Sequence, residues 1–130
     1  MSNNKEVVRR MWEAFSAGDK QAFFAAMADD VKFTVMGTTS LSQVTRGKEE
    51  MIRRVLTPLA AALDGEMTIA IDNIIAEQDC VVMQSRGFGR GKNGKPYNNH
   101  YAQVFKLKDG LVVEWVEYLD TAMLAGILGE

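Results

Sequence analysis

Apolar residues recur at helical spacing near the start of the chain. Val7, Met11 and Phe15 lie four residues apart, which predicts an amphipathic helix over residues 3–17. Gly18 is expected to end this helix. Further helices are predicted over residues 20–28, from residue 47 to residue 63 with a kink or an interruption at Pro58, and over residues 122–128.

Much of the remaining chain alternates apolar and polar residues, as strands do. Strands are predicted over residues 31–36, 67–76, 80–89 and 97–108, and a last strand follows Gly110. The resulting order, α-α-β-α-β-β-β-β-α, predicts an α+β fold with the helices on one face of the sheet. The run 97–108 exceeds the usual strand length, so the sheet is expected to curve. Residues 37–46 are expected to form a polar loop, either a functional lid or plain surface.

Two runs rich in β-branched and aromatic residues flank residues 108–110 and predict a β-hairpin. A two-residue Asp-Gly loop would place Phe105 opposite Glu114. A three-residue loop would pair Phe105 with Val113 instead, and we prefer it because it collects the apolar residues on one face. Its other pairs are Leu107 with Leu111, Gln103 with Trp115, and Tyr101 with Glu117.

In this register Glu117 faces inward, opposite Tyr101 and near Asn99 and Gln103. A carboxylate among aromatic side chains is costly unless it is hydrogen-bonded or solvated. Either Glu117 lies at the open, solvated end of the sheet, or it is an acid/base group in a pocket. A similar choice holds for Arg86, which either enters the same cavity and keeps Glu117 ionised or stays solvated at the rim.

The even-numbered face of the hairpin is too apolar for a solvated surface. It carries His100, Ala102, Val104, Val112, Val116 and Tyr118. Because the opposite face is already committed to the core, we expect a homodimer that forms through the outer face of the sheet.

Composition narrows the possible chemistry. The 130 residues suit a single domain, 1–130, and the net charge of −2 favours neither nucleic acid nor an anionic membrane as a partner. With one cysteine, Cys80, and one histidine, His100, neither an internal disulfide nor a metal site is expected.

The glycine-rich stretch 87–95 does not match the motif of a phosphate-binding loop, because Arg86 stands where the first glycine is needed. No apolar run is long enough to span a membrane, and a cytoplasmic protein is expected.

Two stretches carry a family resemblance. They are A-G-D-x-x-x-F-x-x-x-M-A-D-D at residues 17–30 and, between residues 93 and 121, N-G-K-P-Y-N-N-H-Y followed by V-F-K-L-K-D-G and V-E-W-V-E-Y-L-D-T. They resemble the SnoaL-like branch of the nuclear-transport-factor-2-like superfamily, which includes ketosteroid isomerases, limonene-epoxide hydrolases and SnoaL polyketide cyclases. The resemblance implies a conical α+β barrel of the cystatin-like type, in which a curved mixed or antiparallel sheet surrounds an apolar pocket closed by N-terminal helices.

The resemblance carries over only in part to the catalytic positions. Ketosteroid isomerases need one tyrosine and two aspartates, and the matching positions here are Met11, Val35 and Gln103. None of these takes a proton near neutral pH, so steroid isomerisation by that mechanism is not expected. The three positions of limonene-epoxide hydrolases are Gln84, Arg86 and Glu117 here. SnoaL cyclases place an acid/base aspartate at the last of these, so Glu117 is the catalytic position that matches.

The leading hypothesis is a cofactor-free enzyme that uses Glu117 as general acid/base on a small, largely apolar cyclic compound, in an isomerisation, an aldol-type cyclisation or a hydration. Tyr101 and Arg86 complete the expected catalytic set. The expected ligand-binding residues are Met11, Phe15, Phe33, Val35, Gln84, Asn99, Gln103, Trp115 and Leu119. The alternatives are a non-catalytic binder of a small apolar ligand on the same scaffold, and a scaffold whose interactions are its function.

Overall fold

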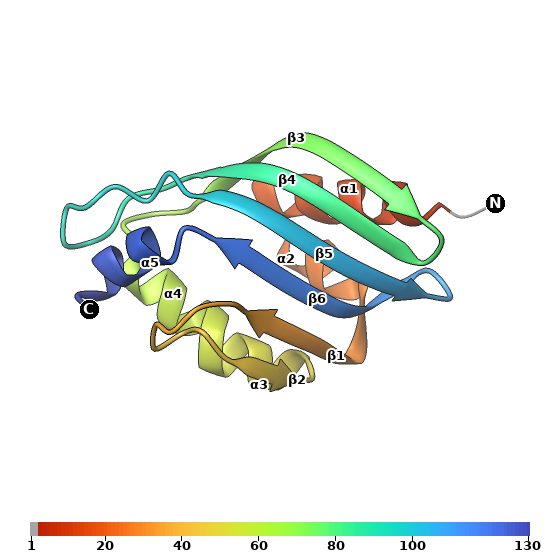
Figure 1. Cartoon of the computed structure of the whole chain (residues 1–130), viewed down its shortest axis with the longest axis horizontal. Coiled ribbons are helices and arrows are strands. Elements are labelled where there is room, and N and C mark those ends of the chain that lie inside the picture. The colour runs from red at the N-terminus through yellow and green to blue at the C-terminus, as the bar shows by residue number, and fades with distance from the viewer. Residues whose placement is uncertain (1–2) are drawn as a thin grey trace.

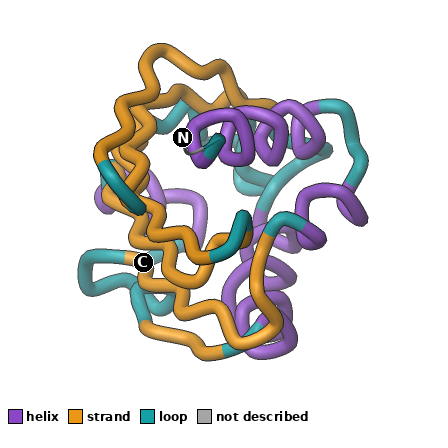
Figure 2. Tube along the Cα trace, turned by 90° about the vertical axis from the view of Figure 1, so that its right-hand side faces the viewer, coloured by secondary structure: helices purple, strands orange, loops and turns teal. Residues whose placement is uncertain are grey.

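A six-stranded sheet curls around the helices in the computed structural model, which describes residues 3–130 (Figure 1, Figure 2). Its strand order is β2-β1-β6-β5-β4-β3, and neighbouring strands are antiparallel except for the parallel pair β1 and β6. The expected α+β fold with a curved, mixed sheet is therefore confirmed. None of the helices described over residues 3–130 is both long and apolar enough to cross a membrane.

The elements follow the chain in this order: α1 (Asn4–Ser16), α2 (Lys20–Ala25), β1 (Met27–Val35), β2 (Val44–Arg46), α3 (Lys48–Met51), the π-helical segment η1 (Ile52–Leu56), α4 (Thr57–Ala62), β3 (Thr68–Glu77), β4 (Cys80–Phe88), β5 (His100–Lys108), β6 (Leu111–Leu119) and α5 (Thr121–Leu128).

Helix α1 packs against α2, β3 and β4 through one face. Its buried residues are Val8, Met11 and Trp12, whose spacing of three to four residues places them on the same side of the helix. The carboxylate of Asp19 accepts a hydrogen bond of 3.1 Å from the backbone N–H of Ala22 and caps the start of α2. The two helices thereby hold aromatic side chains against the inner face of the sheet.

Helix α2 is shorter than predicted, because β1 begins at Met27 rather than at Val31. The Met27 side chain is buried and lies beside Val112 of β6. The backbone N–H of Val112 also donates to the carbonyl of Ala26 at 2.9 Å. Parallel pairing joins segments that are distant in sequence. The pairing of residues 26–27 with Val112 therefore could not be predicted from the local spacing of apolar residues.

The third helical region consists of α3, η1 and α4, which follow one another without a break. Pro58 is the second residue of α4, directly after the π-helical segment η1. Pro58 has no N–H to donate to the carbonyl of Arg54. The Nε2 of Gln43 donates to that carbonyl instead, at 3.2 Å. Gln43 belongs to the stretch predicted as a polar loop, which in fact ends in the short strand β2 antiparallel to β1.

The hairpin of β5 and β6 does not use the predicted three-residue loop. Its turn is the two-residue Asp109–Gly110, with φ angles of 51° and 79°, as a type I′ turn requires. A bulge follows, because Lys106 pairs with Glu114 while Leu107 pairs with Val112, which leaves Val113 as the extra residue. Beyond this bulge Phe105 lies opposite Trp115, Gln103 opposite Glu117, and Tyr101 opposite Leu119.

The bulge and the pairing of β4 with β5 decide which side chains face inward. Val112, predicted on the outer face, is fully buried, because the turn places it on the core side of the bulge. In β4 the buried residues are Val81, Met83, Ser85 and Gly87, so the even-numbered residues point outward. The expectation that Gln84 and Arg86 share the interior face is therefore wrong.

Candidate functional site

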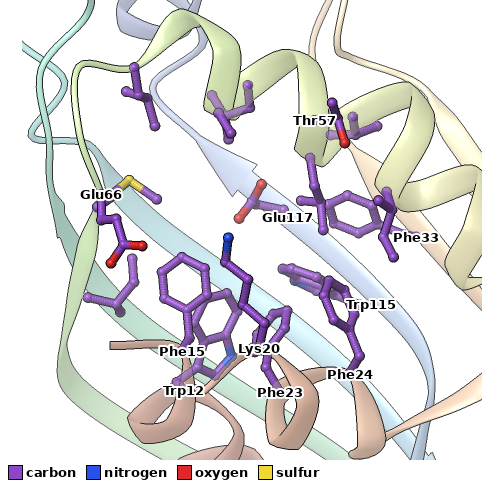
Figure 3. Close-up of a pocket in the computed structure, with 18 of the residues that line it drawn as sticks. Trp12, Phe15, Lys20, Phe23, Phe24, Phe33, Thr57, Glu66, Trp115 and Glu117 are labelled. Atoms are coloured by element: carbon purple, nitrogen blue, oxygen red, sulfur yellow. The ribbon is translucent and has the colours of Figure 1, made fainter. Parts of the chain in front are cut away.

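A cavity of about 340 Å³ lies between the concave face of the sheet and the helices. Its walls come from α1, α2, η1 and α4 on one side and from β1, β3, β5 and β6 on the other (Figure 3). Small-molecule sites usually measure about 300–1,000 Å³ and are mostly apolar with a few polar groups. The size and position of this cavity make it the candidate site.

Aromatic rings form the apolar wall of the cavity. Trp115 lies with its ring centroid 4.1 Å from that of Phe33 and 5.4 Å from that of Trp12. Phe23 and Phe15 extend the wall through contacts of 5.1 Å and 5.3 Å with Trp12. Edge-to-face and offset ring pairs of this kind are favourable beyond the area that they bury. These rings form a continuous apolar surface that suits a flat apolar ligand.

Glu117 of β6 provides the carboxylate of the cavity. It lines the space and is half-buried, and Figure 3 shows its carboxylate directed toward the cavity. Removal from water raises its pKa to about 7, although the hydrogen bond from Gln103 acts in the opposite direction. A carboxyl group with this pKa exchanges its proton near neutral pH, as a general acid or base must.

A short chain of hydrogen bonds fixes the position of Glu117. The Nε2 of Gln103 donates to Oε1 of Glu117 at 2.9 Å. Behind it, the hydroxyl of Ser85 donates to Oε1 of Gln103 at 3.2 Å, which orients the amide so that its N–H groups face Glu117. Gln103 and Ser85 are both fully buried. The bond from Gln103 occupies Oε1 of the carboxylate, and no hydrogen bond from residues 3–130 occupies Oε2, which is open to a ligand.

Tyr101 lines the same cavity and supplies a neutral hydroxyl. Its Oη donates to the Oη of Tyr97 at 3.3 Å and also lies 3.8 Å from the sulfur of Met67. Burial raises the pKa of both tyrosines, that of Tyr97 to about 12. Both hydroxyls therefore keep their protons at neutral pH, and in this pair Tyr101 is the donor and Tyr97 the acceptor.

The structure excludes Arg86 and Gln84 from the site. The Nη2 of Arg86 lies 2.9 Å from Oδ1 of Asp72 on the outer face, and its guanidinium lies over the ring of Phe88. Gln84 is exposed and accepts a hydrogen bond from Asn73 at 3.3 Å. Both were predicted to face inward because the wrong alternation was assumed for β4. No arginine of the described residues 3–130 lines the cavity beside Glu117.

The other predicted residues divide into two groups. Phe15, Phe33, Gln103 and Trp115 line the cavity together with Tyr101 and Glu117. Four residues do not line it, namely Met11, Val35, Asn99 and Leu119. Met11 and Val35 belong to the core beneath it.

Asn99 has a structural task at the junction of β5 and α5. It is fully buried, and its Nδ2 donates to the carbonyl of Asp120 at 3.1 Å. Its Oδ1 accepts from the backbone N–H groups of Asp120 and His100, at 3.0 Å and 2.8 Å. These bonds leave Asn99 engaged with the backbone rather than with a ligand.

On the helical side of the cavity, the sequence analysis had included Phe15 but none of the other lining residues. Trp12, Lys20, Phe23, Phe24 and the inward residues of η1 and α4 all line it. The run of aromatic residues in the first two helices was a signal that could have indicated them, because the helices were expected to close the pocket. Within residues 3–130, no group of three or more His, Cys, Asp or Glu side chains is placed to hold a metal ion.

Comparisons with known proteins match this geometry. The family model described as the SnoaL-like domain matches residues 8–115. Rv0034, an uncharacterized protein of Mycobacterium tuberculosis, is 27% identical over 113 residues, which cover 87% of this chain and 86% of that protein.

Solved structures agree with the same fold. A nuclear-transport-factor-2-like protein of unknown function from Burkholderia pseudomallei has a TM-score of 0.84 and 28% identity over 100% of both chains. TerC, co-crystallized with polyporic acid, has a TM-score of 0.84 at 20% identity, covering 99% of this chain and 100% of that one. The similarity to TerC shows a shared fold.

Proposed function

This chain belongs to the SnoaL-like domain family, and from that premise we propose that it is a cofactor-free enzyme in which Glu117 acts as general acid/base on a small, largely apolar cyclic molecule. The reaction class is isomerisation, cyclisation or hydration, each of which needs proton transfer at a carbon or oxygen atom. The observation that carries the proposal is a carboxyl group with a pKa of about 7 at the edge of an aromatic cavity.

The geometry supports a division of labour among three side chains. Glu117 in its ionised form takes a proton from a carbon atom next to a carbonyl group and returns it to another atom of the same molecule. Gln103 holds the carboxylate in place through its bond of 2.9 Å. The hydroxyl of Tyr101 turns its single proton from Tyr97 to the carbonyl oxygen when the ligand binds, because negative charge develops on that oxygen.

The second candidate is a non-catalytic binder of a small ligand. It is favoured by the small number of ionisable groups along the cavity and by TerC, which was co-crystallized with polyporic acid on the same fold. In that case the aromatic wall would be the functional part of the cavity, and Glu117 would serve only to orient the ligand.

The test is Glu117→Gln, which keeps the size and the hydrogen bonding of the side chain but removes its titration. A panel of cyclic ketones, epoxides and polyketide-like aldehydes is screened for turnover with the wild-type protein. We expect the variant to lose at least about 100-fold in kcat, the usual range for a general acid/base. Glu114→Gln is the matched control, because Glu114 lies on the same strand but pairs with exposed Lys106.

Ligand binding separates the two candidates. The chain has two tryptophans, Trp12 and Trp115, and both line the cavity, so their fluorescence reports on occupancy. If Glu117→Gln binds a ligand as the wild type does but no longer turns it over, Glu117 is catalytic. Unchanged turnover in the variant would contradict the enzyme proposal and leave the binder.

We also propose that two copies associate through the outer face of the sheet. At paired positions of four neighbouring strands this face carries Ile75, Val82, Val104 and Val116. Ile75 is 57% exposed, and an apolar row of this length is unusual on a solvated surface. The homodimer interface is expected to centre on this row.

A further inference from the structure

Lys20 is the one lysine or arginine among the described residues that line the cavity. It stands at the first position of α2, directly after the capping residue Asp19. Figure 3 shows its ammonium group directed into the space between the aromatic rings and Glu117. Neither the family resemblance nor the sequence pattern assigned a role to this residue.

The ammonium group of Lys20 has no carboxylate partner within the described part of the chain. Other basic residues do, for example Lys48 with Asp29 at 3.5 Å and Arg86 with Asp72 at 2.9 Å. The cavity also contains two carboxylates, Glu66 at its rim and Glu117, yet neither lies within the 4.0 Å of an ion pair with Lys20. The cavity thus offers a cation that is free to meet a ligand.

We propose that Lys20 binds an anionic oxygen of the ligand, so that the preferred ligands of this cavity are cyclic apolar molecules carrying one carboxylate or one ring-bound oxygen anion. The inference rests on the proposed function of the same cavity, and it makes Lys20 the residue that determines specificity.

Lys20 is the group in the described lining that attracts an anion. The carboxylates Glu66 and Glu117 repel one, so without the positive charge of Lys20 the cavity would favour neutral ligands. A neutral ligand gains nothing comparable. The ammonium group is a point charge with three donors and no preferred plane, so a carboxylate and a phenolate or enolate oxygen suit it equally.

A lysine at the mouth of an apolar cavity also has a purely structural explanation. Its methylene groups can cover apolar surface while the ammonium group stays in water. The two explanations differ in what they predict for ligands. Under the structural one, removing the charge of Lys20 leaves the relative affinity for charged and neutral ligands unchanged.

The experiment compares 2-naphthoate with 2-naphthamide, which have the same ring system and differ in charge, by isothermal titration calorimetry at pH 5.5, where Glu117 is protonated and does not repel the naphthoate. We expect the wild-type protein to bind the carboxylate about fivefold more tightly than the amide, the upper effect of a partly screened ion pair. Lys20→Met should abolish this preference, and Lys20→Arg should keep it. Lys5→Met is the matched control, because Lys5 lies on α1, is exposed and does not line the cavity.

Three results would overturn the proposal: equal affinities of the wild type for the two probes, a preference that survives Lys20→Met, and no binding of either probe at millimolar concentration. These results are independent of the role of Glu117. A failed enzyme proposal shows itself as unchanged turnover in Glu117→Gln, whereas a failed Lys20 proposal shows itself in the ratio of the two affinities.

Discussion

Glu117 should make the stability of the folded protein depend on pH in a way that Glu117→Gln removes. In the folded state its pKa rises from the ordinary 4.5 to about 7, because burial disfavours the charged carboxylate. The folded protein therefore binds more protons than the unfolded chain between pH 4.5 and pH 7. Stability must then fall as the pH rises through this window and level off above it.

The magnitude follows from the size of the pKa change. One pKa unit corresponds to about 1.4 kcal/mol, so a rise of about 2.5 units, from 4.5 to about 7, costs the wild-type protein at most about 3 kcal/mol at pH 8 relative to pH 4.5. Glutamine at position 117 is neutral throughout and keeps a partner in Gln103. Relative to the wild type, Glu117→Gln should therefore gain stability as the pH rises.

The assay is urea unfolding at pH 5, 6, 7 and 8, followed by tryptophan fluorescence. The quantity of interest is the difference in unfolding free energy between Glu117→Gln and wild type at each pH, because other titrating groups cancel in it. We expect that difference to grow by about 2–3 kcal/mol from pH 5 to pH 8. The same difference for Glu114→Gln should stay flat. A flat difference for Glu117→Gln would show that the Glu117 carboxylate is solvated and refute the reasoning.

The remaining predictions concern Gln103 and the outer face of the sheet. Gln103→Leu removes the hydrogen bond that lowers the pKa of Glu117. When both proteins carry Gln103→Leu, the stability difference between Glu117→Gln and its parent should therefore level off at a pH above about 7; an unchanged upper end would mean that this bond is not formed in solution. Light scattering at micromolar concentration should give a dimer mass for the wild type and a monomer mass for Val104→Glu, whose position lies in the middle of the outer apolar row. A wild-type monomer would contradict the dimer.

Local patterns determined the elements that depend on residues close in sequence. The apolar residues of α1 recur every three or four positions, and they predicted its bounds within one residue at each end. The β5–β6 hairpin and the C-terminal helix were likewise predicted close to their observed ranges. The inward direction of Glu117 followed from alternation along β6, because residues two apart in a strand share a face.

Register and parity were decided by the tertiary structure. The alternation of apolar and polar residues predicts that a strand has two different faces. Which of them points into the core depends on how the strand pairs with its neighbours. Pairing with β5 turns Ser85 inward and Arg86 outward. The two-residue turn and the bulge at Val113 each shift the pairing by one residue, and together they change the partner of Glu117 from Tyr101 to Gln103. Each error of a single residue therefore changed the chemistry expected beside Glu117.

The composition of the candidate site also depended on long-range packing. Glu117 lies near the end of the chain and Lys20 near its beginning, and they line one cavity because α2 packs beside β1, which pairs with β6. The sequence singled out the carboxylate, because an acidic residue between aromatic neighbours is costly to bury. Only the packing of the helices over the sheet raised its pKa and brought a free cation to the same space, since desolvation and charge proximity are properties of the assembled fold.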